Sequence, residues 1–234
     1  MWYPLDKYEL EEMLNSFFSI EPLKIDFKVH GLIVPHAGYF YSGDIAGKAF
    51  SLLNPKKTII ISPNHHKYFR GVMTHNENFW KTPLGKIKII ESDFEKMDLK
   101  NEHSIDNQIP FLQKLGINEI LPISIGEISM DEAKEIAINL NKNKEEFNFV
   151  FSTDLSHFYT NEKAKIIDTQ TINIIKNLDF ENFNKVNACG YFPLMVLFNL
   201  CLINEWKPFL LEYKTSAEKN QDNSSVVGYA SFAF

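Results

Sequence analysis

The fold is decided by the segment that reads FNFVFSTDLSH over residues 147–157. Aromatic and β-branched residues dominate Phe147 to Thr153, which predicts a continuous strand buried in a sheet. Asp154 and His157 follow directly, so the strand delivers a carboxylate and an imidazole to the loop just beyond its end. The segment therefore predicts both a central strand and one side of a chemical site.

Two further strands end in the same way. Gly31 to Pro35 reads as a buried strand followed by His36, and Thr58 to Pro63 is a β-branched strand followed by His65 and His66. In an open α/β sheet the carboxyl ends of parallel strands form the crevice in which ligands bind. Because three strand ends carry such groups, we expect these side chains to share one cleft.

The remaining pattern alternates strands with amphipathic segments. A strand or hairpin arm is predicted over Gly85 to Ile90, strands over Glu119 to Gly126, Phe209 to Lys214 and Val226 to Phe234, and helices over Gly43 to Leu53, Ser104 to Leu115, Asp131 to Asn141, Ala164 to Leu178 and Tyr191 to Ile203. Strands alternating with helices predict a three-layer αβα sandwich around a mixed, mostly parallel sheet. No linker or repeat interrupts the pattern, so residues 1–234 are expected to form a single domain.

Composition excludes several classes of partner. Lysine and arginine number 24 and aspartate and glutamate 30, a formal net charge of −6. Binding to nucleic acid or to an anionic membrane needs a dense basic surface, so neither is expected. Two cysteines make no disulfide framework, and no stretch resembles a signal peptide or a bilayer-spanning helix. The sequence predicts a cytoplasmic protein.

The remaining histidines differ in their settings. His65 and His66 are adjacent, so their side chains point in different directions, and we expect one metal ligand and one group that faces the substrate or supports the site. His103 opens a predicted helix, where it could donate to a substrate oxygen; alternatively the segment is a helix start capped by Ser104. His30 and His75 lack such a setting and are expected on the surface.

The two cysteines also differ. Cys189 precedes Gly190 and an apolar helix, and a helix N-terminus lowers the pKa of a thiol, which favours a metal ligand or a nucleophile. The alternative is that Cys189 is a small buried hydrophobic residue. Cys201, among Leu and Ile in the middle of that helix, is expected to be buried and inert.

An ordered series of motifs runs along the chain: Trp2-Tyr3-Pro4, Pro35-His36-Ala37-Gly38-Tyr39, Tyr41-Ser42-Gly43, Pro63-Asn64-His65-His66, Thr82-Pro83-Leu84-Gly85, Glu102-His103-Ser104, Pro110-Phe111-Leu112, Ser152-Thr153-Asp154-Leu155-Ser156-His157, Ala188-Cys189-Gly190 and Ser224-Ser225-Val226-Val227-Gly228-Tyr229. In this series the chain resembles the Memo family over almost its whole length. The family is grouped in bacteria and archaea with a radical-SAM protein, which the resemblance implies as a candidate partner.

The resemblance also implies a fold and a site. The family's fold is similar to that of class III extradiol dioxygenases, nonhaem iron enzymes that open catechol rings. The family's cleft carries two histidines and a cysteine, which would be His36, His65 and Cys189 here. Asp154 and His157 would lie beside the metal, with His66 and His103 completing the lining of the cleft. The segment between Met73 and Glu102 looks shorter than in many relatives.

The leading functional hypothesis is a metal-dependent redox protein that acts on a small molecule. Two imidazoles and a thiolate suit iron or copper, and zinc as well. His157 could serve as general acid or base, and Asp154, three residues earlier, could orient its ring if the loop makes a helical turn. The alternatives are a cleft that only binds a peptide or partner protein, and a zinc hydrolase. Similarity of fold to ring-opening dioxygenases does not by itself assign that reaction.

Overall fold

The computed structural model describes residues 2–20 and 24–234. Its helices are α1 (Lys7–Phe18), α2 (Tyr39–Phe50), α3 (His103–Asp106), α4 (Ile109–Lys114), α5 (Met130–Asn141), α6 (Asn161–Asn177), α7 (Tyr191–Asn204) and α8 (Ala217–Asn220), with a 3₁₀ turn at Phe183–Lys185. Its strands are β1 (Gly31–Val34), β2 (Lys57–Ser62), β3 (Val72–His75), β4 (Phe79–Thr82), β5 (Gly85–Ile89), β6 (Glu95–Met97), β7 (Glu119–Ile125), β8 (Phe147–Ser152), β9 (His157–Tyr159), β10 (Phe209–Thr215) and β11 (Val226–Ala233).

The strands form one mixed sheet with a parallel centre. Its main order is β10-β11-β1-β8-β2-β7-β3-β6. The central strands β1, β8, β2 and β7 are parallel, and β11 and β3 join them antiparallel on the two sides. All residues of β1 and β8 are buried, because helices cover both faces of the sheet.

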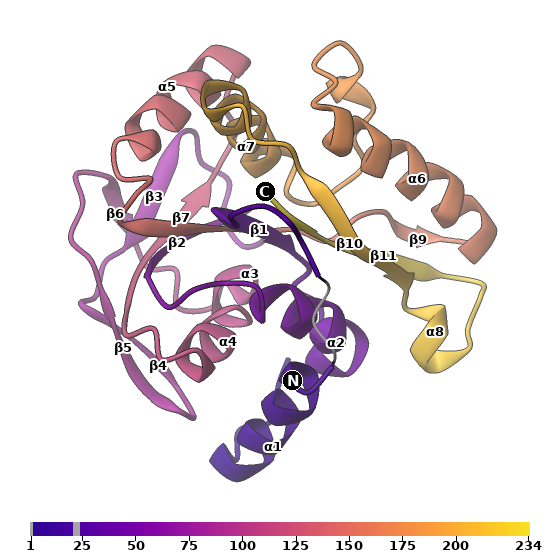
Figure 1. Ribbon diagram of the computed structural model, residues 1–234, viewed down its shortest axis with the longest axis horizontal. Coiled ribbons are helices and arrows are strands. Elements are labelled where there is room, and N and C mark those ends of the chain that lie inside the picture. The colour runs from indigo at the N-terminus through magenta and orange to yellow at the C-terminus, as the bar shows by residue number, and fades with distance from the viewer. Residues whose placement is uncertain (1, 21–23) are drawn as a thin grey trace.

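Two helical layers enclose the sheet, as Figure 1 shows. The helices α5, α6 and α7 cover one face, and α1, α2, α3 and α4 cover the other. Each layer has its own apolar core, one around Phe149 and Phe198 and the other around Phe50 and Phe111. The predicted three-layer αβα architecture is therefore confirmed. Within residues 2–20 and 24–234, no helix combines the length and the apolar character needed to cross a lipid bilayer.

Several predicted boundaries were wrong. The helix predicted over Ser104 to Leu115 is two short helices, because Asn107 and Gln108 between them turn their side chains to the backbone that follows β1. Ser104 does not cap α3; Glu102 does, by accepting from the Ser104 N–H at 3.1 Å. The helix predicted from Gly43 begins at Tyr39.

On one side of β7 the sheet splits into two branches, because two different strands, β5 and β3, pair with β7 at different points along its length. Near its start β7 pairs with β5 at Ile120, and near its end it pairs with β3 at Ser124. Pro122 lies between these positions and has no N–H to donate, while its carbonyl accepts from the Thr74 hydroxyl at 2.8 Å. The strands β3 and β5 therefore separate from each other at Pro122.

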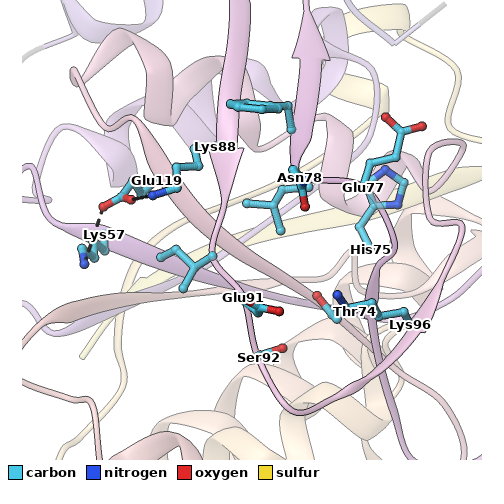
Figure 2. A pocket seen from close by; sticks show the side chains of 13 residues that line it. Lys57, Thr74, His75, Glu77, Asn78, Lys88, Glu91, Ser92, Lys96 and Glu119 are labelled. Carbon is cyan, nitrogen blue, oxygen red and sulfur yellow. Dashed lines mark hydrogen bonds and ion pairs between the residues drawn. The ribbon is translucent and has the colours of Figure 1, made fainter.

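A cavity of about 520 Å³ lies in this fork (Figure 2). Lys88 and Lys57 hold the Glu119 carboxylate on one side, at 2.7 and 3.5 Å, and His75 and Glu77 lie together on the other. Its charged lining residues are three lysines, Lys57, Lys88 and Lys96, and three glutamates, Glu77, Glu91 and Glu119. The formal charges of these lysines and glutamates therefore sum to zero.

The predicted surface positions of His30 and His75 were wrong. His75 is buried against Trp80, with ring centroids 4.9 Å apart, and its Nδ1 accepts from the Leu99 N–H at 3.1 Å. His30 is half-buried and stacks on Trp206, with ring centroids 4.4 Å apart. Both histidines contribute packing that their local sequence does not indicate.

The buried ring of His75 should make stability depend on pH. Burial lowers the pKa of His75 below its usual 6.5, so the unfolded state binds more protons below that pH. The free energy of unfolding should therefore fall as the pH drops below about 6.5. In His75→Gln, whose amide can still accept from Leu99, proton uptake on unfolding should decrease by up to about one proton. Urea titrations of both proteins between pH 5 and 8 measure this; equal pH dependence would contradict it.

Candidate metal centre

Three adjacent parallel strands deliver the candidate residues to one cleft. The loops after β1, β2 and β8 carry His36, His65 and Asp154, and these strands are neighbours in the sheet. The cleft has a volume of about 400 Å³ and is lined by Trp2, His36, Ala37, Gly38, Tyr41, His65, His103, Asp154, His157, Val227 and Tyr229. The carboxyl edge of the parallel centre is thus where these side chains meet.

Buried hydrogen bonds fix the imidazole of His36. The Gln108 side-chain amide donates to the Pro35 carbonyl at 3.0 Å and to the Ser152 hydroxyl at 2.8 Å. The Ser152 hydroxyl in turn donates its own proton to the Ser104 carbonyl at 2.6 Å. At 2.9 Å from Ser152 Oγ, His36 Nδ1 must therefore donate, because the hydroxyl has no second proton. This leaves the lone pair on Nε2, which faces the cleft.

Glu102 fixes the ring of His65 by hydrogen bonds, as Ser152 fixes that of His36. Its carboxylate accepts from the His65 ring Nδ1 at 2.8 Å and from the His65 backbone N–H at 2.7 Å. Burial alone would raise the pKa of Glu102, but the hydrogen bonds from His65 and Ser104 lower it to about 2. The carboxylate is therefore ionised at neutral pH and holds the proton of His65 on Nδ1, so that Nε2 is the available nitrogen.

His103 completes a group of three imidazoles. One ring nitrogen from each of His36, His65 and His103 lies within 4.8 Å of the others. Burial and the neighbouring His65 lower the pKa of His103 to about 4, so its ring is neutral at pH 7. The ring stacks parallel on Trp2, with centroids 4.1 Å apart, and this contact fixes its plane. Three ring nitrogens so close together could hold a metal ion.

Cys189 lies beside this group, at His36. Its Sγ is 3.2 Å from His36 Nε2 and accepts from the Asp154 backbone N–H at 3.2 Å. The prediction that the helix N-terminus lowers the thiol pKa was wrong: burial, together with the Asp154 carboxyl, raises the pKa of Cys189 to about 12. Burial is the larger cause and the Asp154 carboxyl adds to it, while the hydrogen bonds from the Asp154 and Gly190 N–H groups and from Thr153 offset them only in part. Cys201 is buried in α7, as expected.

Asp154 contacts His36 and not His157. Its carboxyl accepts from the His36 backbone N–H at 2.8 Å, and its second oxygen is 3.9 Å from His36 Nε2. Burial raises the pKa of Asp154 to about 7 despite this hydrogen bond. The condition under which Asp154 would orient His157, a helical turn between them, is not met, because residues 153–156 form no helix or turn and His157 begins β9. Pairing of β9 with β11 aligns His157 with Val227 and sets its position.

His157 and His66 differ in their access to the cleft. His157 lines it, and burial lowers the pKa of its ring below the usual 6.5, so the ring is neutral at pH 7. His66 is exposed, with its ring centroid 6.4 Å from that of His103. It is not among the residues that line the cleft.

Sequence reasoning gave no site role to several residues that build the cleft. Trp2, Tyr41, Val227 and Tyr229 form its walls, and Gln108 and Ser152 set the proton of His36. The wall residues all lie within the quoted motifs, which was the available signal. No local signal identified Gln108, whose partners Pro35 and Ser152 are 73 and 44 positions away.

A family model and the curated relatives agree on one family. The family model described as Memo-like protein matches residues 1–233. A "MEMO1 family protein" of Methanobrevibacter smithii is 36% identical, covering 100% of this chain and 96% of the relative. One from Nitrosopumilus maritimus is 33% identical with the same coverage, 100% and 96%. The crystal structure of uncharacterized protein JW3007 from Escherichia coli K12 is 12% identical, covers 86% of this chain and 98% of that chain, and has a TM-score of 0.49.

Proposed function

Because this chain belongs to the Memo family, we propose that its cleft is a metal-dependent redox site that acts on a small molecule. His36, His65 and Cys189 are the proposed ligands, and iron or copper is the proposed metal. The observation that carries the proposal is the fixed tautomer of His36, whose buried hydrogen bonds leave Nε2 unprotonated and facing the cleft. A histidine prepared in this way is typical of a metal ligand.

The donor types of the proposed ligands suit such an ion, while the side chains whose donor atoms all lie within 4.8 Å of one another are His36, His65 and His103. In both His36 and His65 the Nδ1 atom is engaged by a hydrogen bond, so each ring offers Nε2. The 3.2 Å between Cys189 Sγ and His36 Nε2 is close to the separation of about 3.5 Å between a sulfur and a nitrogen ligand on one ion. One soft thiolate with two imidazoles favours copper, iron or zinc over magnesium or calcium.

The other residues have roles of their own in this proposal. A bound iron or copper ion would supply one-electron chemistry. The neutral ring of His157 can accept a proton from a ligand in the cleft, and the neutral ring of His103 can donate a hydrogen bond to it. Trp2, Tyr41 and Tyr229 line the cleft around these groups.

Metal analysis tests the proposal. Protein purified without a tag and loaded under anaerobic conditions is expected to retain about one equivalent of iron or copper per chain. His65→Ala should lose the metal, while His66→Ala, which changes an exposed ring outside the lining, should keep it. If the unmutated protein retains neither metal after desalting, the redox function is excluded.

The carboxylate of Glu102 should control metal affinity through His65. Glu102→Ala removes the acceptor for His65 Nδ1, so the ring can rotate and change tautomer. The loss of such a supporting contact is expected to weaken metal binding about 10- to 100-fold. Competition with a chromogenic chelator measures the affinity. Glu127→Ala, at a partly exposed glutamate outside the lining of the cleft, is the control, and an equal loss in both variants would contradict the role.

One observation favours a second candidate function, a cleft that binds a ligand without transforming it. Phe158, next to His157, has a left-handed φ of +65° and an exposed side chain. This conformation is costly for a large side chain and is often retained for function. An exposed aromatic ring at the rim could contact a bound peptide or partner protein. Ligand binding that persists in metal-free protein, without any redox change in the loaded protein, would favour this function.

A further inference from the structure

One buried hydroxyl group in the cleft lacks a hydrogen bond. Tyr229 lines the cleft and is only 2% exposed, yet its hydroxyl makes no hydrogen bond to any residue that the structure describes. Buried polar groups are nearly always hydrogen-bonded, because the loss of water is costly unless another partner replaces it. The ring of Tyr229 borders the open volume of the cleft, so a ligand in the cleft is the partner that could satisfy its hydroxyl.

The other two buried tyrosines of the described chain show the usual arrangement. Tyr3 donates to a carboxylate at 2.6 Å, and Tyr39 donates to a backbone carbonyl at 2.7 Å. The hydroxyl of Tyr41, which also lines the cleft, makes no hydrogen bond within the described residues either, but Tyr41 is only half-buried, so the loss of water costs less there. Among residues 2–20 and 24–234, Tyr229 is thus the one buried tyrosine whose hydroxyl the fold itself leaves unpaired.

The sheet fixes the position of Tyr229. Antiparallel pairing of β11 with β1, continued past the end of β1, places Tyr229 alongside His36. The preceding residue, Gly228, accepts from the Leu155 N–H at 2.8 Å and donates its own N–H to the Ser156 carbonyl at 2.9 Å. These backbone contacts hold the ring at one place on the wall of the cleft, so a ligand meets a donor whose position is already set.

The ligand atom that meets this hydroxyl is a hydrogen-bond acceptor. Burial raises the pKa of Tyr229, and the nearby Asp154 and Tyr41 raise it further, so the phenol keeps its proton and can donate it. Asp154 is the one acidic residue in the lining of the cleft, and no lysine or arginine of the described residues lines it. A bound metal ion would be the largest charge in such a site and would outweigh one carboxylate. A carboxylate oxygen next to that ion therefore suits both the ion and the phenol.

We propose that the hydroxyl of Tyr229 donates a hydrogen bond to a carboxylate oxygen of the substrate. The inference rests on the proposed function and adds the chemical class of the substrate, a small carboxylate that binds next to the metal. The position of Tyr229 alongside His36 brings the phenol close to one of the proposed metal ligands. A few fixed polar groups of this kind orient a ligand in its pocket. Removal of the hydroxyl should therefore weaken substrate binding and leave the metal in place.

Formate, the smallest carboxylate, is the probe that tests the inference. The protein is loaded with whichever of iron(III) and copper(II) it retains, and azide is added because its complexes with both ions absorb visible light. The affinity for formate is read from the displacement of azide, once the azide affinity of each variant has been measured. Tyr229→Phe should keep the metal and weaken formate binding about tenfold, because one hydrogen bond to a charged group is lost. Tyr8→Phe, which changes a tyrosine that is 75% exposed on α1, should leave formate binding unchanged.

Thermal unfolding of the metal-free protein, without any ligand, supplies an independent measurement. Tyr229→Phe should not lower the Tm, because its hydroxyl has no partner in the protein to lose, whereas Tyr39→Phe should lower it by about 2–4 °C. Equal lowering of the Tm in both variants, or equal formate affinity in Tyr229→Phe and the unmutated protein at equal metal content, would overturn the inference and leave the proposed function standing. If the unmutated protein retains neither metal, the proposed function fails and this inference fails with it.

Discussion

Replacing Cys189 with serine is expected to weaken the binding of iron(II) or copper by about a hundredfold or more. A site whose total binding free energy is about 10–16 kcal/mol depends on each of its few ligands for several kcal/mol. Serine has almost the same shape, so it should keep the contact with the Asp154 N–H but provide a much poorer donor for a soft metal. Anaerobic competition with a chromogenic chelator measures the loss in both proteins, and the absorption of the thiolate–metal bond should appear in the unmutated protein and be absent from the variant.

The matched variants decide which group is the third ligand. Cys201→Ser changes a buried cysteine in α7 and should leave metal binding intact, although it lowers stability. His103→Ala should retain most of the metal, since His103 is proposed to face the substrate. If His103→Ala loses the metal and Cys189→Ser keeps it, the ligands are the three histidines and the role proposed for Cys189 is wrong.

Gly228→Ala is expected to destabilise the fold by about 1–3 kcal/mol through overpacking. A Cβ atom on Gly228 would overlap the carboxyl of Asp168, which is fully buried in α6. That carboxyl cannot move away easily, because it accepts from the Ser156 N–H at 2.9 Å and from the Tyr213 hydroxyl at 2.8 Å. Urea denaturation at pH 7 measures the change in the free energy of unfolding.

A double-mutant cycle checks the cause. Asp168→Ala alone should also destabilise the fold, because two donors lose their acceptor. In the Asp168→Ala background, however, the added methyl of Gly228→Ala has room, so its cost should largely disappear. If the losses in the free energy of unfolding from the two single substitutions simply add in the double variant, overlap with Asp168 is not the reason for glycine at position 228.

The centre of the fold could be predicted because its strands are buried on both faces. The apolar run from Gly31 to Val34 and the largely aromatic and apolar run from Phe147 to Ser152 favour strands, and both strands form where expected. The helices α5, α6 and α7 were also predicted, with small errors at their ends. In these segments local pattern and tertiary packing favour the same structure.

The peripheral elements could not be predicted, because partners far away in sequence determine them. The strands β3, β6 and β9 have only three or four residues each and form against neighbours already in the sheet. The break between α3 and α4 depends on bonds from Gln108 to Pro35 and Ser152. The burial of His75 likewise depends on Trp80 and Leu99, which its own neighbours do not reveal.

The candidate site shows the same division. The strand-end positions of His36, His65 and Asp154 predicted that they would meet, because parallel strands share an edge. The sequence did not predict which ring nitrogen of His36 carries the proton, or that the pKa of the Cys189 thiol is high. The tautomer of His36 depends on a chain of hydrogen bonds through Ser152, and the high pKa of the Cys189 thiol depends on how deeply that sulfur is buried.

The place of β1 in the sheet has a consequence for biosynthesis. Although it is the first strand in sequence, β1 is held between β8 and β11, with Leu32 opposite both Val150 and Ala233. A nascent chain emerging from the ribosome cannot complete this pairing until β11 has been translated, about 190 residues after β1. His36 follows β1 and so remains unanchored until then. If the proposed site holds a metal, the cell would have to supply it after β11 has paired with β1, because the site is not assembled earlier in synthesis.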